Sequence, residues 1–175
     1  MEGPNFDPVV GEEVRVGFRP GIFKIIQVRP PKEEHPNQNL HTPESIFGSV
    51  DLRQKGSGFA LPAIPWHLLN YVDVTRFVCR TIDWLKTSPD GRKYPDYIVD
   101  YEVKDGQDHE GNPSIFVRFF VDPDYFYENG HVSEEKVAAS NEFLDSVRNE
   151  LLSLELDRWI SVRAGDARRV LDVAS

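Results

Sequence analysis

The stretch SIFVRFFV, residues 114–121, is the densest run of β-branched and aromatic residues in the chain. Turn signals bound it on both sides, Gly-Asn-Pro before it and Asp-Pro after it. Its alternation sets one face, Ile115, Val117, Phe119 and Val121, against another, Phe116, Arg118 and Phe120. We therefore predict a central strand, against which neighbouring elements bury their own apolar residues.

The remainder of the C-terminal half, residues 75–175, combines helical and strand periodicities. The expected elements are helices over residues 75–87, 133–155 and 167–174 and strands over 97–104, 114–121 and 157–163. Ser133, followed by two glutamates, is the expected N-cap of the long helix. The order α-β-β-α-β-α predicts an α+β domain with its helices on one face of a small sheet.

The N-terminal half is organised differently, as short alternating segments separated by turns. Residues 1–10 predict an extended lead-in, and a polar, proline-rich stretch at 30–43 predicts a long surface loop. Residues 11–74 predict four or five short strands, the third over 45–53, with a single helical turn before the last strand. The chain is thus expected to contain a small β-barrel followed by the α+β domain.

The end of this segment carries a family resemblance. Ile64-Pro65 followed by Asn70-Tyr71-Val72 is similar to the Pro…Asn-Tyr-Val ending of SH3-like barrels, and the resemblance implies that fold for residues 11–74. Peptide-binding SH3 domains also carry an Ala-Leu-Tyr-Asp-Tyr stretch and a paired tryptophan, which this segment lacks, so binding of proline-rich peptides is not implied. The C-terminal half resembles small uncharacterised bacterial proteins, a resemblance that implies no activity.

Composition points to a cytoplasmic protein that does not associate with membranes. Of the 175 residues, 39% are hydrophobic and 28% charged, which is ordinary for a globular protein. No apolar run approaches the roughly 20 residues that span a bilayer, and the N-terminus lacks the basic start and apolar core of a signal peptide. The single cysteine, Cys79, allows no internal disulfide and suits a reducing compartment.

The net charge of −9 is unevenly distributed. Residues 1–74 carry 7 Lys and Arg against 9 Asp and Glu, whereas residues 75–175 carry 13 against 20, which gives −2 and −7. Because acidic surfaces repel a phosphate backbone, we expect no nucleic-acid binding by the C-terminal half. In the barrel, a basic strip could contact phosphate; its residues are Arg15, Arg19, Lys24 and Arg29.

The segment DPDYFY, residues 122–127, is the candidate partner-binding site. It joins two strong elements and carries three successive aromatic residues with acidic neighbours. Tyrosine is enriched in protein interfaces, so we predict that this loop contacts a protein partner. The predicted contact residues are Asp122, Asp124, Tyr125, Phe126 and Tyr127. The alternative is a lid packed over the sheet edge.

Catalytic signatures are weak. Asp96, Glu102 and Lys104 have the letters of a PD-(D/E)xK nuclease motif, but six residues of strand separate the carboxylates by about 20 Å, too far to share a metal. The five histidines and the acidic loops lack metal-binding spacing. We expect no catalytic residues, no metal site and no cofactor.

One short segment is similar to part of a motif found in RNA-binding domains. Residues 116–119, Phe-Val-Arg-Phe, match the last four positions of the RNP1 motif, but residues 112–115 fail the first four. We therefore expect Phe116 and Phe120 to belong to the core or to be covered by a neighbouring element. The favoured function is a non-enzymatic protein interaction module or adaptor in a cytoplasmic complex. The alternatives are a nucleic-acid-associated protein using the basic strip and a metal-dependent nuclease.

Overall fold

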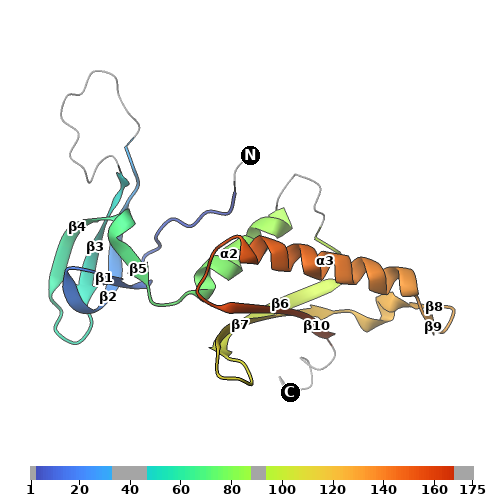
Figure 1. Cartoon of the computed structure of the whole chain (residues 1–175). Coiled ribbons are helices and arrows are strands. Elements are labelled where there is room, and N and C mark those ends of the chain that lie inside the picture. Colours follow the sequence, from blue (N-terminus) through green and yellow to red (C-terminus); the bar gives the residue numbers. More distant parts are fainter. Residues whose placement is uncertain (1–2, 33–46, 88–93, 168–175) are drawn as a thin grey trace, which may run out of the picture. The chain divides into compact units, whose positions relative to one another are not determined.

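The computed structural model describes residues 3–32, 47–87 and 94–167 (Figure 1). The chain divides into two compact units, each with its own hydrophobic core. We call residues 6–73 the N-terminal unit, and residues 74–175 together with residues 1–5 the C-terminal unit. The chain contains both helices and strands, and the strands form separate sheets. The protein is therefore α+β, as predicted.

The N-terminal unit is a five-stranded antiparallel sheet in the order β4-β3-β2-β1-β5. Its elements are β1 (Glu13–Val16), β2 (Arg19–Arg29), β3 (Ser49–Gln54), β4 (Ala60–Pro65), the 3-10 helix η1 (Trp66–Leu68) and β5 (Leu69–Tyr71). Among the described residues no pairing joins the edge strands β4 and β5, so the closed barrel that the resemblance implies is not shown.

Alternation along these strands separates an inner from an outer face. The inner face carries the core residues Val14, Val16, Phe23, Ile25, Val50, Leu52, Ile64 and Leu69. Strand β3 begins at Ser49, later than predicted, because Gly48 has φ +75°, outside the β region. Most of the predicted loop, and the start of the predicted third strand, lie outside the described residues.

The C-terminal unit contains a three-stranded sheet in the order β10-β7-β6. Its elements are α2 (Thr75–Thr87), β6 (Ile98–Gln107), β7 (Pro113–Val121), the 3-10 helix η2 (Pro123–Phe126), β8 (Tyr127–Glu128), β9 (His131–Val132), α3 (Glu134–Leu152) and β10 (Trp159–Asp166). Strand β7 is central, as predicted; β6 pairs with it antiparallel and β10 parallel. The parallel pairing is possible because α3 forms the crossover between β7 and β10. The predicted terminal helix falls almost entirely outside the described residues.

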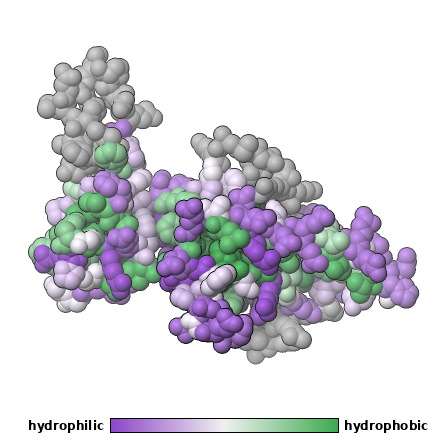
Figure 2. Space-filling view, viewed as in Figure 1, coloured by the Kyte–Doolittle hydropathy of each residue, from purple (hydrophilic) through white to green (hydrophobic). Residues whose placement is uncertain are grey.

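Helices α2 and α3 cover the same face of this sheet (Figure 1). The core beneath them includes Ile115, Val117, Phe119 and Val121, the face of β7 predicted to be buried. The outer side of α3 and the tip of the β6–β7 hairpin are hydrophilic (Figure 2). None of the helices in the described residues lies on the opposite face of β7, so the expectation that Phe116 is covered is wrong: its side chain is 38% exposed.

The two long helices begin where the sequence predicts. The side chain of Ser133 accepts a hydrogen bond from the backbone N–H of Lys136, and Glu134 and Glu135 occupy the first turn of α3, where the helix dipole favours acids. None of the helices in the described part of the chain is both long and apolar enough to cross a membrane.

Candidate functional site

An open pocket of about 470 Å³ lies at one end of the C-terminal sheet. Its lining residues come from the approach to β6, from the end of β7 with η2, and from α3; they are Pro95, Asp96, Tyr97, Asp122, Tyr125 and Ala139. This volume lies within the range of small-ligand sites, roughly 300–1,000 Å³. The pocket therefore has room for a side chain or a small molecule.

Local hydrogen bonding explains how the segment after β7 reaches this pocket. The carboxylate of Asp122 accepts a hydrogen bond of 3.0 Å from the backbone N–H of Asp124, and Pro123 begins the 3-10 helix η2. The backbone N–H of Asp122 donates to the carbonyl of Tyr97 over 2.9 Å. These bonds turn the chain back toward the start of β6, where Tyr97 lies.

The apolar wall of the pocket is a stack of tyrosine rings. The Tyr97 and Tyr125 rings lie 4.4 Å apart at an interplanar angle of 26°, and Phe126 contacts both edge-on. The ammonium of Lys136 lies 4.7 Å from the Tyr125 ring centroid and pairs with Glu128 over 2.9 Å. Stacking on one side and Lys136 above its ring hold Tyr125 in place.

The inner end of the stack is partly buried. Burial raises the pKa of Tyr97, although a hydrogen bond shared with the buried hydroxyl of Ser140 acts in the opposite direction. Tyr97 is thus a neutral hydroxyl at physiological pH. The formal charge on the residues that line the pocket comes from Asp96 and Asp122, so the pocket is acidic.

The structure divides the predicted partner-binding residues. Asp122 and Tyr125 line the pocket, whereas Phe126 is half-buried against the core, in the manner of the lid alternative. Tyr127, on β8, is 53% exposed, and Asp124 lies on η2 outside the pocket lining. The sequence assigned Asp96 to a nuclease motif instead of this pocket, because its proximity to Asp122 depends on the pairing of β6 with β7.

The nuclease residues are separated in the fold. Asp96 belongs to the pocket, while Glu102 lies on β6 and forms an ion pair of 2.8 Å with Lys104. Within residues 3–32, 47–87 and 94–167, no group of three or more His, Cys, Asp or Glu side chains is arranged to hold a metal ion.

The residues of the basic strip have different surroundings. Arg15 and Lys24 are exposed on β1 and β2, outside the core. The guanidinium of Arg19 lies 3.8 Å from the ring centroid of Phe59. The guanidinium of Arg29 donates hydrogen bonds to the Asp51 carboxylate, so the charge of this member of the strip is balanced within the protein.

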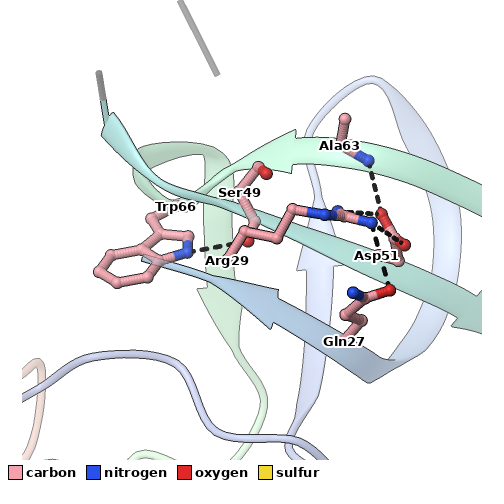
Figure 3. Close-up of polar contacts among 6 residues, drawn as sticks. All are labelled: Gln27, Arg29, Ser49, Asp51, Ala63 and Trp66. Carbon is pink, nitrogen blue, oxygen red and sulfur yellow. Dashed lines mark hydrogen bonds and ion pairs between the residues drawn. The ribbon is translucent and has the colours of Figure 1, made fainter. Parts of the chain in front are cut away.

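The Arg29–Asp51 pair connects strands of the N-terminal sheet (Figure 3). Both terminal nitrogens of Arg29 donate to the Asp51 carboxylate over 2.7 Å, and one of them also reaches Gln27. The backbone N–H of Ala63, whose φ is +54°, donates to the same carboxylate over 2.9 Å. Asp51 thereby links β2, β3 and β4 and supports an unfavourable backbone conformation, which is a structural role.

We expect Asp51→Asn to reduce the acid sensitivity of the N-terminal unit. The hydrogen bonds from Arg29, followed by that from Ala63, hold the pKa of Asp51 below its ordinary value despite partial burial. A depressed folded-state pKa contributes stability above the unfolded pKa of about 4, and that stability is lost as pH falls through the folded value. Urea midpoints measured from pH 7 to pH 2 should therefore show a difference between wild type and variant that shrinks on acidification.

Asp108→Asn is the matched control for this titration. Asp108 also has a lowered pKa, owing first to hydrogen bonding from the Asn112 side chain, but it lies in the C-terminal unit. Its substitution should leave the acid dependence of the N-terminal unit unchanged. A wild-type to Asp51→Asn difference that stays constant from pH 7 to pH 2 would contradict the assignment.

No protein-family model, curated protein or solved structure matches this chain.

Proposed function

We propose that this protein is a non-enzymatic interaction module of a cytoplasmic complex, and that its C-terminal unit binds a basic side chain of a partner protein. The observation that carries the proposal is the acidic pocket walled by the Tyr97–Tyr125 stack. An arginine or lysine side chain would lay its hydrocarbon stem along the tyrosines and place its charge beside the carboxylates.

Long-range charge supports the same kind of partner. Residues 75–175 carry 13 Lys and Arg against 20 Asp and Glu, a net charge of −7. Such a field speeds association with a cationic partner and slows association with an anionic one. Tyr127, exposed beside the pocket segment, would extend the contact area with the aromatic residue type that interfaces favour.

We further propose that the N-terminal unit is an SH3-like sheet. Its strand order, β5-β1-β2-β3-β4, and the 3-10 helix before β5 support the resemblance carried by its final residues. We assign the N-terminal unit no nucleic-acid contact through the basic strip. Arg29 forms an ion pair with Asp51, and the Arg19 guanidinium lies over the Phe59 ring.

The proposal is tested by NMR titration of the full chain with two acetylated, amidated tripeptides, Gly-Arg-Gly and Gly-Gln-Gly. We expect saturable amide shifts at Asp96, Tyr97 and Tyr125 with the arginine peptide and weak, unsaturated shifts with the glutamine peptide. Asp96→Asn should weaken arginine-peptide binding roughly 10- to 150-fold, the effect of losing one hydrogen bond between charged groups of about 1.5–3 kcal/mol.

Asp157→Asn is the matched control, since it removes one exposed carboxylate of the same unit outside the pocket lining. It should leave the affinity within about 2-fold. Equal binding of the two peptides, or equal weakening by both variants, would overturn the pocket as the recognition site. Asp96 is preferred to Asp122 as the tested residue because Asp122 caps η2, and its loss would perturb the fold.

A further inference from the structure

The face of the C-terminal sheet opposite α2 and α3 has an unusual composition. In register across its strands, Lys104 on β6 pairs with Phe116 on β7, and Arg118 on β7 pairs with Arg163 on β10. We call this surface the open face; its principal side chains are Glu102, Lys104, Phe116, Arg118, Phe120, Trp159 and Arg163. It shares no residue with the pocket.

Two arginines stand directly opposite each other at the middle of the open face. Like charges at paired positions of neighbouring strands are destabilising. Glu102 on β6 lies directly opposite Arg118 in register, but its carboxylate forms an ion pair of 2.8 Å with Lys104. Among the described residues, neither Arg118 nor Arg163 makes an ion pair or a side-chain hydrogen bond, so two guanidiniums are available to an external anion.

The side chain of Arg118 lies across β10, where a glycine makes room for it. A Cβ at Gly165 would come within 3.1 Å of the Arg118 Cδ and 3.4 Å of its Cγ. The stem of Arg118 therefore extends toward the strand that carries Arg163, away from Glu102. Arg118 and its register partner Arg163 are therefore both associated with β10.

Aromatic side chains lie on both sides of the arginine pair. Phe116 precedes Arg118 by two residues and is 38% exposed, while Phe120 follows it by two and is half-buried. Trp159, on the same face of β10, is 69% exposed. Exposed rings of this size offer flat surfaces for stacking, and the adjacent guanidiniums offer donors for phosphate oxygens.

We infer that the open face binds single-stranded nucleic acid. Arg118 and Arg163 would hold a phosphate between them, and bases would stack on Phe116 and Trp159. This activity goes beyond the interaction function proposed above and rests on different residues, so either one can fail alone.

The net charge of −7 does not exclude such binding, although it limits the affinity. Charges separated by more than about 8 Å are largely screened at physiological ionic strength, so the local pair dominates once contact is made. A second copy of this chain is a poorer occupant, because a self-complementary interface there would bury four unpaired guanidiniums. Binding should be modest and steeply dependent on salt.

The test is fluorescence anisotropy of fluorescein-labelled oligo(dT) and oligo(U) ten-mers with the full chain at 50, 100 and 200 mM salt. We expect saturable binding that weakens as salt rises. Arg118→Gln and Arg163→Gln should each lower the slope of log affinity against log salt by about 0.7. Phe116→Ala should weaken binding roughly 5- to 150-fold, the range for losing one stacked base.

Arg53→Gln is the matched control, because it removes an exposed arginine from the sheet of the N-terminal unit, outside the basic strip. It should leave both affinity and salt slope unchanged, and circular dichroism melting curves should show each variant folded. The inference is overturned if neither oligonucleotide binds at 50 mM salt, or if Arg53→Gln weakens binding as much as Arg118→Gln. It is also overturned if light scattering shows a protein dimer that Phe116→Ala dissociates while the binding of the oligonucleotides is unaffected.

Discussion

Replacing Phe119 by alanine should lower the free energy of unfolding of the C-terminal unit by about 3–5 kcal/mol, the usual cost of a Phe→Ala cavity in a core. Phe119 is fully buried on the central strand, and its ring packs against those of Tyr94, Tyr101 and Phe143. The cavity would therefore be lined by large aromatic rings from β6, α3 and the segment before β6, which have little freedom to collapse into it. Urea unfolding followed by circular dichroism measures the loss.

Phe116→Ala on the same strand is the control for this loss. It removes an identical ring from the open face, where the side chain is already 38% exposed. We expect a cost of about 1 kcal/mol, which reflects mainly strand propensity. Similar losses for the two variants would mean that the open face is covered in solution, contrary to the fold described above.

Local periodicity was sufficient to predict the main elements of the C-terminal unit. The alternation of residues 114–121 identified β7 as the central strand and separated its two faces, because successive side chains of a strand point in opposite directions. Helix α2 spans Thr75–Thr87, the range predicted from its apolar spacing. Alternation could not say which face the helices cover, or whether both faces are covered, and the expectation for Phe116 failed for that reason.

The candidate sites depend on pairings between residues far apart in sequence, which no local pattern encodes. Arg118 and Arg163 are paired in register only because α3 returns the chain so that β10 pairs parallel to β7. The Tyr97–Tyr125 stack depends on the register of β6 with β7 and on the cap of η2. Arg29 is predicted as a phosphate contact from the basic residues of the first two strands, and its bond to Asp51 could not be foreseen because Asp51 lies in a different predicted strand.

Gly48→Ala is the substitution expected to be most damaging to the N-terminal unit among those that add a single methyl group. Gly48 has φ +75°, and a Cβ there would lie 2.6 Å from the Trp66 indole Cε2 and 2.8 Å from its Cδ2. The left-handed backbone costs an alanine about 1–2 kcal/mol, and displacing a packed ring costs a similar amount. The free energy of unfolding should therefore fall by about 2–4 kcal/mol.

Gly56→Ala separates these two contributions. Gly56 has φ +88°, but a Cβ there would contact nothing within 4 Å. The free energy of unfolding of this variant should therefore fall only by the cost of the left-handed backbone, about 1–2 kcal/mol. The Trp66 indole N–H, which donates to the Ser49 carbonyl over 3.2 Å, provides a direct readout (Figure 3). Its NMR resonance should shift in Gly48→Ala and stay in place in Gly56→Ala, because only the first methyl group displaces the ring. Equal destabilisation with an unmoved indole resonance in both variants would show that backbone strain, and not the contact with Trp66, requires glycine at position 48.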